Sequence, residues 1–237
     1  MIDITVVMMT HAEGDMAKLS LESLDQAVDF ARESGLSVEK IITLDNPDEA
    51  TINALKGLDE SEYKLVRLTC GDLGKVRNHV SEIAQGEYMA VLDGDDLWSF
   101  NWLMEAHRIC KAESGDTIVH PEFNWLFEGV NNIFAHSDLG DDFFDMECLR
   151  STNPWDSLCF CKTDIIRNFP YVKRQIKEGF AYEDWNWNRR TFEAGIQHIV
   201  AKDTVIFKRR RNASQGAQAA KRGVIAKPSS SSYYDYY

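Results

Sequence analysis

The sequence predicts an α/β fold: a mostly parallel sheet covered by helices, followed by a smaller region of mixed structure. In the first half, four short apolar runs are separated by stretches with helical periodicity, which is typical of a parallel sheet. In the second half, the pattern changes to a hairpin and isolated strands. The 237 residues, 44% of them hydrophobic, suffice for one substantial core and favour a single domain over two independent ones.

The first half can be assigned element by element. Asp15 is expected to cap a helix that ends near Gly35, and Asp48 to cap the next helix. Ligands bind where parallel strands end, so we expect Thr10, Asp45 and the turn after the fourth strand to share one rim of the sheet. The expected strands are 2–9, 40–44, 63–68 and 87–92. The helix capped by Asp48 is expected at 49–58, and a third helix at 74–85.

The second half is expected to be mixed. Glu128 and Gly129 join two apolar runs and predict an antiparallel hairpin, and Gly195 is expected to end the last helix. Residues 215–237 finish in a low-complexity Ser- and Tyr-rich run and are expected to form a mobile tail. The expected helices are 101–112, 163–168 and 182–194, and the expected strands are 117–120, 123–127, 130–135, 157–161, 197–200 and 204–208.

The net charge of −12 argues against a general nucleic-acid binder and against a protein that coats anionic membranes. No acidic residue occurs between Asp203 and Asp235, so this basic end could meet an anion. Peripheral membrane contact stays open, although 208–227 lacks a convincing amphipathic stripe. The five cysteines form no regular framework and favour reduced thiols in the cytoplasm, and no apolar run is long enough for a transmembrane segment.

Stretch 86–98, GEYMAVLDGDDLW, brings three carboxylates to the end of a buried strand. Asp93, Asp95 and Asp96 are interrupted only by Gly94, which lets the backbone turn without a Cβ clash. Oxygen ligands at this spacing can hold Mg²⁺ or Mn²⁺ together with the phosphates of a substrate. The alternative is an ordinary surface turn, in which the carboxylates bond only to nearby backbone N–H groups.

A second acidic group, Glu183 and Asp184, opens the helix expected at 182–194. A helix N-terminus lowers the cost of a carboxylate, and the neighbouring aromatic rings of Tyr182 and Trp185 could shield it from water. The alternative is an acidic first turn that only complements the helix dipole.

Four segments occur in an order that resembles the inverting GT-A glycosyltransferases of family 2, over about residues 2–214. They are MMTHAEGD at the end of the first strand, the turn at Asp45, KVRNHVSEIAQGEYMAVLDGDDLW, and YEDWNWNRR at 182–190. The resemblance implies transfer of a sugar from a nucleoside diphosphate, UDP being favoured, to the hydroxyl group of a glycan or another acceptor. It also implies a nucleotide-sugar-binding half at 1–120 and an acceptor-side half at 121–214.

Within this resemblance, Asp95 is the metal ligand, with Asp93 beside it, for a Mn²⁺ or Mg²⁺ ion that stabilises charge on the departing diphosphate. No histidine follows His198 to act as a further ligand, so phosphate oxygens and water would complete the shell. Asp184 corresponds to the base that takes the acceptor proton, and Glu183 supports it. The positions implied for donor binding are Thr10, Asp45, Arg77, Asp93, Gly94, Asp96, Arg209 and Arg210.

Among these positions, Thr10 and Asp45 match residues that contact the nucleotide base, while Arg77 matches a basic residue near the phosphates. For Arg77 the alternative is an ion pair with a surface acid. The loop 153–156 is expected to contact the acceptor. The tryptophans 155, 185 and 187 are expected to divide between the core and a stacking platform for sugar.

Two other functions remain open from the sequence. A sugar nucleotidyltransferase on a related fold would normally have a glycine-rich phosphate loop after the first strand, but THAEGDMAK contains only Gly14. A degenerate, non-catalytic binding module of a larger glycan-assembly protein is the other alternative. The intact carboxylates Asp93, Asp95 and Asp184 weigh against it.

Overall fold

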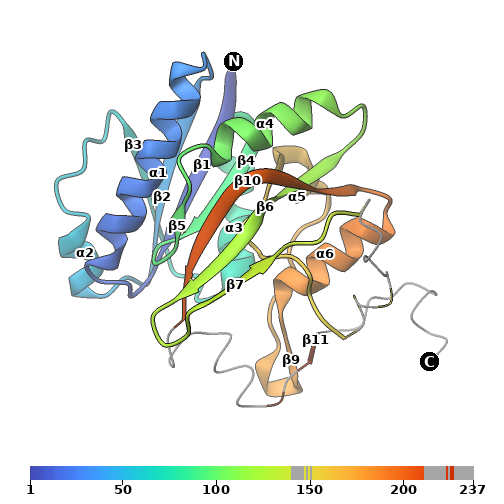
Figure 1. Cartoon of the computed structure of the whole chain (residues 1–237). Coiled ribbons are helices and arrows are strands. Elements are labelled where there is room, and N and C mark those ends of the chain that lie inside the picture. Colours follow the sequence, from blue (N-terminus) through green and yellow to red (C-terminus); the bar gives the residue numbers. More distant parts are fainter. Residues whose placement is uncertain (140–146, 148, 150, 211–222, 224, 227–237) are drawn as a thin grey trace.

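The computed structural model describes residues 1–139, 147, 149, 151–210, 223 and 225–226 (Figure 1). The tail expected at 215–237 therefore lies outside the described residues, except for those last three positions. The strands of the first half are β1 (Ile2–Thr10), β2 (Val38–Asp45), β3 (Tyr63–Leu68) and β4 (Gly86–Asp93), and the helices are α1 (Met16–Glu33), α2 (Glu49–Ala54) and α3 (Leu73–Ile83).

The second half contains shorter and more varied elements. Its strands are β5 (Leu97–Trp98), β6 (Thr117–Phe127), β7 (Asn132–Ala135), β8 (Phe160–Lys162), β9 (Phe180–Ala181), β10 (Gln197–Arg209) and β11 (Ile225–Ala226). Its helices are α4 (Trp102–Ala112), α5 (Thr163–Asn168), the 3₁₀ helix η2 (Ile176–Glu178) and α6 (Glu183–Glu193).

One nine-stranded sheet organises the molecule, in the order β3-β2-β1-β4-β8-β6-β10-β5, with β7 paired to β6 outside this path (Figure 1). The four strands β3, β2, β1 and β4 are parallel, as predicted, and β6 and β10 form a second parallel pair. Strand β8 joins the two groups through antiparallel pairing with β4 and β6. The expected α/β fold with a smaller mixed region is thus confirmed.

The core lies on both faces of this sheet. Every residue from 4 to 10 in β1 is buried, as expected for a central parallel strand that is covered on both sides. Helix α1 contacts α4, and α3 contacts α5. Within the described residues, no helix combines the length and apolar character needed to cross a bilayer.

Several local expectations were wrong. Asp15 precedes α1, but its side chain makes no capping hydrogen bond and pairs instead with the Lys18 ammonium at 2.8 Å. The helix expected at 49–58 ends at Ala54. Strands β6 and β10 are each continuous, although each was expected as two strands. The short strands β5, β9 and β11 were not expected, because two residues are too few to show a periodicity.

The two long strands accommodate their interruptions at one place. Pro121 of β6 pairs opposite Ala201 of β10, where the register shifts before Val205. Proline donates no ladder hydrogen bond, and a bulge is where a sheet tolerates that loss. Asp203 adopts a positive φ of 61° within the bulge, and its N–H donates to the Glu122 carboxylate at 2.7 Å.

Gly86, the first residue of β4, has no room for a side chain. An added Cβ would lie 2.6 Å from the carbonyl carbon of Ile4 and 2.9 Å from the Thr5 hydroxyl oxygen. We expect Gly86→Ala to lower the free energy of unfolding by about 1–3 kcal/mol, because the backbone of β1 must move. Urea denaturation measures this change. Gly115→Ala is the matched control, since no atom lies within 4 Å of its added Cβ; equal stability loss in both variants would contradict the prediction.

Candidate functional site

The acidic turn, residues 93–96, packs directly against the end of β1. The N–H of Gly94 donates to the Met9 carbonyl at 2.8 Å, and the N–H of Asp96 donates to the Asp93 carbonyl at 3.0 Å. A Cβ on Gly94 would lie 2.8 Å from the Thr10 methyl carbon, so this close approach needs glycine. The turn and Thr10 therefore meet at one rim of the sheet.

Thr10 and Asp45 lie at the carboxyl ends of neighbouring strands β1 and β2, on the rim expected for them. The buried Thr10 hydroxyl donates to the Thr43 carbonyl at 2.6 Å. The Asp45 carboxylate accepts from the N–H groups of Cys70 at 2.6 Å and Gly71 at 2.9 Å. Asp45 thus holds the loop between β3 and α3 in place. Contacts of Thr10 and Asp45 with a nucleotide stay a prediction.

Lys208, near the end of β10, lies among three carboxylates. Its ammonium nitrogen is 3.0 Å from Asp96 Oδ2, 3.1 Å from Asp156 Oδ1 and 3.5 Å from Asp93 Oδ2. Asp96 is 2% exposed, and its other carboxylate oxygen accepts from the N–H of Arg209 at 2.8 Å. The acidic turn is thereby fastened to β10, and its buried negative charge is partly neutralised within the protein.

The charges around Lys208 shift its partners in different directions. Burial raises the pKa of the Asp96 carboxyl, with Lys208 opposing this change and Asp93 and Asp95 adding to it. Burial would also raise the pKa of Asp156, but the Lys208 charge, His136 and hydrogen-bond donors outweigh it and hold that pKa below its usual range. Asp156 accepts from the amide of Asn124 at 3.0 Å as well as from Lys208. Asp156 is therefore an ionised partner for the Lys208 ammonium group.

Glu183, the first residue of α6, is buried between two arginines. Its Oε1 lies 3.0 Å from Arg77 Nη1, and its Oε2 lies 3.9 Å from Arg174 Nε. Arg77 is 1% exposed and also has Nη2 at 3.9 Å from Asp93 Oδ1. Burial opposes the charge on Arg77, but Glu183 and the other nearby negative groups outweigh this effect and raise its pKa. Arg77 thus links the acidic turn to the acidic start of α6.

Asp184 follows Glu183 and is half-buried. Burial, with the Glu183 charge adding to it, raises the pKa of Asp184 to about 6, while Arg77 acts in the opposite direction. The Asn153 amide donates to Asp184 Oδ2 at 3.4 Å and is itself held by the Asn188 amide at 3.0 Å. Asp184 is therefore a carboxylate that can gain and lose a proton close to neutral pH, as a general base must.

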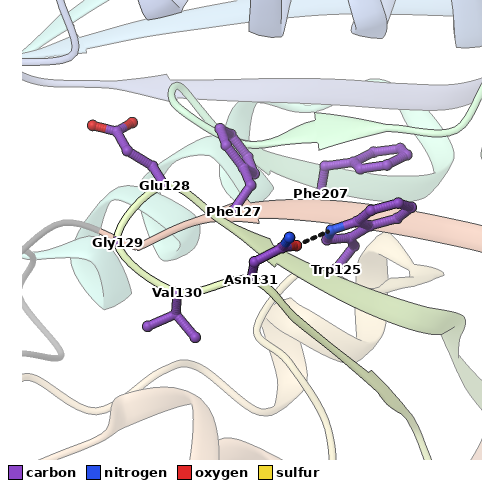
Figure 2. A pocket seen from close by; sticks show the side chains of 7 residues that line it. All are labelled: Trp125, Phe127, Glu128, Gly129, Val130, Asn131 and Phe207. Atoms are coloured by element: carbon purple, nitrogen blue, oxygen red, sulfur yellow. Dashed lines mark hydrogen bonds between the residues drawn. The ribbon is translucent and has the colours of Figure 1, made fainter.

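Arg209 and Arg210 lie at the end of β10, beside the β6–β7 hairpin. The Arg209 guanidinium forms an ion pair with Glu128 at the hairpin tip, and the N–H of Arg210 donates to the Phe127 carbonyl at 3.0 Å. An open hollow of about 620 Å³ lies on this hairpin, and Figure 2 shows the side chains that line it. Trp125, 39% exposed, is held at its edge by donation from its Nε1–H to Asn131 Oδ1 at 3.0 Å.

The tryptophans belong mostly to the core. Trp155 is buried and stacks on His198, with ring centroids 4.1 Å apart. Trp187 is buried against Tyr171 at 4.9 Å. Trp185 is half-buried and donates to the Leu149 carbonyl at 2.8 Å. For Trp155 and Trp187, the core interpretation is therefore the correct one.

Sequence reasoning missed Arg174, and it named Lys208 and Asp156 only as members of a basic run and of a loop, without a role of their own. Lys208 occurs in a run of four basic residues, and only its position on β10 distinguishes it from Arg209. Asp156 belongs to the loop expected to contact an acceptor, so its location was a usable signal. Arg174 precedes η2 in a region without a clear pattern.

The carboxylates of the acidic turn suit a hard divalent cation. Asp93 Oδ1 is buried and accepts no hydrogen bond, so it has lone pairs available as a ligand. Asp95, half-buried, lies two residues further along the same turn. The described residues contain no group of three or more His, Cys, Asp or Glu side chains that could hold a metal. Asp93 and Asp95 could therefore supply two oxygen ligands to such an ion.

Comparison with solved structures places this arrangement in a known fold. The structure of S. aureus TarS 1–349 in complex with UDP-GlcNAc matches with a TM-score of 0.67 and 14% identity, over 91% of this chain and 61% of that one. The mannosyltransferase PcManGT from Pyrobaculum calidifontis, in complex with GDP-Man and Mn²⁺, matches with a TM-score of 0.61 and 16% identity, over 91% of this chain and 59% of that one. The chain thus spans about three fifths of either structure, and the likeness shows the GT-A fold.

A search of curated proteins found no match. The family model described as "Glycosyl transferase family 2" matches residues 5–138, more than half of the chain, including most of β1 and the acidic turn. The protein therefore belongs to glycosyl transferase family 2.

Proposed function

We propose that the protein is a metal-dependent, inverting glycosyltransferase. It moves a sugar from a nucleoside diphosphate-sugar, with UDP favoured, to the hydroxyl group of a glycan or another acceptor. The observation that carries this proposal is the position of the Arg77 guanidinium, which lies 3.0 Å from Glu183 of α6 and 3.9 Å from Asp93 of the acidic turn. Two carboxylate centres with different tasks are thus close enough to serve one reaction.

Asp184 acts on the acceptor, as the general base of the reaction. In a single displacement, the base takes the proton of the acceptor hydroxyl while that oxygen attacks the sugar carbon opposite the leaving diphosphate. A carboxylate with a pKa of about 6 is mostly ionised at pH 7 and is more basic than an exposed aspartate. Glu183, paired with Arg77, stays in place to support this environment.

The nucleotide-sugar donor binds at the rim of the sheet, where β1, β2 and β4 end. Asp95 and Asp93 would hold Mn²⁺ or Mg²⁺, which supplies positive charge for the departing diphosphate. Asp96 and Gly94 shape the turn, and Arg209 and Arg210 supply further counter-charge. The base of the nucleotide is assigned to Thr10 and Asp45 at the ends of β1 and β2.

The solved relatives support the ligand class. Structures of TarS were solved in complex with UDP-GlcNAc and with UDP, and the structure of PcManGT in complex with GDP-Man and Mn²⁺. Membership of a glycosyltransferase family weighs against the nucleotidyltransferase alternative. A role in glycan or polysaccharide synthesis in the cytoplasm completes the proposal.

Calorimetric titration with UDP, with and without Mn²⁺, tests the donor site. We expect Mn²⁺-dependent binding to the wild-type protein. Asp95→Ala should weaken it by about 100-fold or more, because a neighbouring carboxylate cannot replace the lost ligand geometry. The matched control is Asp29→Ala, which removes an exposed carboxylate from α1.

The two possible failures are distinct. If the wild-type protein binds no nucleotide with either Mn²⁺ or Mg²⁺, the proposed function is wrong. If it binds UDP and Mn²⁺ and Asp95→Ala binds them equally well, only the assignment of Asp95 is wrong.

A further inference from the structure

Lys208 connects two segments that lie far apart in the sequence. One is the acidic turn 93–96. The other is the loop 151–159, which directly precedes β8. The ammonium group lies at 3.0 Å from Asp96 and 3.1 Å from Asp156, so one cation holds both segments. Its own strand, β10, is fixed by parallel pairing with β6 over most of its length.

The loop 151–159 in turn reaches the proposed base. Asp156 Oδ1, the oxygen bound by Lys208, also accepts from the N–H of Leu158 at 3.1 Å, so this carboxylate shapes the loop. Three residues earlier, Asn153 donates to Asp184 at 3.4 Å. A continuous set of contacts therefore runs from the acidic turn, through Lys208 and Asp156, to the residue beside Asp184.

Negative charge exceeds positive charge around Lys208. One ammonium is shared among three carboxylates that are each at most one-fifth exposed, so full pairing of all three with Lys208 is impossible. Any cation that takes up the charge of Asp93 leaves more of the Lys208 interaction for Asp96 and Asp156. Because free-energy coupling between two sites is reciprocal, order in the loop must then also favour ligand binding at the turn.

We infer that Lys208 is a positioning residue that couples ligand binding at the acidic turn to the order of loop 151–159. In this role it sets Asn153 beside Asp184 when the donor site is filled. The inference rests on the proposed function for the identity of the ligand, but the tie between turn and loop is a property of the protein alone.

Hydrogen–deuterium exchange of peptides from 151–159 tests the coupling, with UDP plus Mn²⁺ as the probe. In the wild-type protein, the probe should slow exchange in this loop by about fivefold, a typical size for coupling between two sites. In Lys208→Met, the loop should exchange faster without ligand, and the response to the probe should disappear. Lys202→Met is the matched control, because it removes an exposed lysine of the same strand that pairs with Glu122 at 3.7 Å. In this variant, loop exchange without ligand and its slowing by the probe should both be as in the wild type.

Asp156→Asn is the second variant, because it keeps the size of the side chain and leaves Lys208 with Asp93 and Asp96. It should loosen the loop as Lys208→Met does, while peptides from the acidic turn exchange as in the wild type. Wild-type loop exchange in either folded variant, or a retained response to UDP and Mn²⁺ in Lys208→Met, would overturn the inference. Failure of the wild type to bind UDP would reject the proposed function instead, and the ligand-free comparison would still decide whether Lys208 holds the loop.

Discussion

Asp184→Asn should lower sugar transfer by about 100- to 10,000-fold, the range that a general base contributes, while UDP and Mn²⁺ bind almost as in the wild type. Asparagine keeps the shape of the side chain and its contact with Asn153 but cannot accept the acceptor proton. The release of UDP, as the sugar of a UDP-sugar passes to an acceptor or to water, measures the reaction, and calorimetry measures binding. Equal loss of binding and turnover would show that Asp184 is not the base.

The pH dependence of turnover gives the same residue an independent test. Burial and the Glu183 charge raise the pKa of Asp184 to about 6, with Asp156 adding to the rise and Arg77 opposing it. Below this pH the carboxyl is protonated and cannot take a proton, so kcat/KM should fall about tenfold for each further pH unit. An acid limb centred near pH 4, the ordinary range for an exposed aspartate, would contradict the assignment.

Arg77→Met should lower the free energy of unfolding by about 3–5 kcal/mol, because it leaves the buried Glu183 carboxylate without its nearest cation. Arg174 remains, but its Nε is 3.9 Å from Glu183 rather than 3.0 Å. Urea denaturation of the purified protein measures the loss.

The double variant Arg77→Met/Glu183→Gln separates the charge effect from lost packing against Tyr171, over which the guanidinium lies at 5.1 Å. Once the unpaired carboxylate is gone, the double variant should be more stable than Arg77→Met alone. If the double variant is the less stable of the two, the ion pair is not the source of the loss.

The sequence predicted well those elements whose signals are local. Strand β3 and helix α5 begin and end at the expected residues, since apolar runs and turn residues mark both ends. The continuity of β10 could not be predicted, because Asp203 looks like a turn residue. Its positive φ is accommodated by hydrogen bonds between this bulge and β6, a strand about eighty residues away in the chain.

The site was predictable only where chemistry and position coincide. Asp93 to Asp96 follow a recognisable strand, and Asp184 opens a recognisable helix. Lys208 and Arg209, by contrast, are alike in the sequence. Successive side chains of a strand point to opposite faces, and the pairing of β10 with β6 directs Lys208 to Asp156 while Arg209 pairs with Glu128.

The place of β10 in the sheet affects when the site can form during synthesis. This strand is made after every other strand of the large sheet, yet it lies between β6 and β5. Until residues 197–209 have emerged from the ribosome, β6 and β5 lack their shared neighbour, and contacts of such long sequence separation form slowly. Lys208 arrives with this strand, so a nascent chain that already contains the acidic turn and the start of α6 still lacks the cation that joins the turn to loop 151–159.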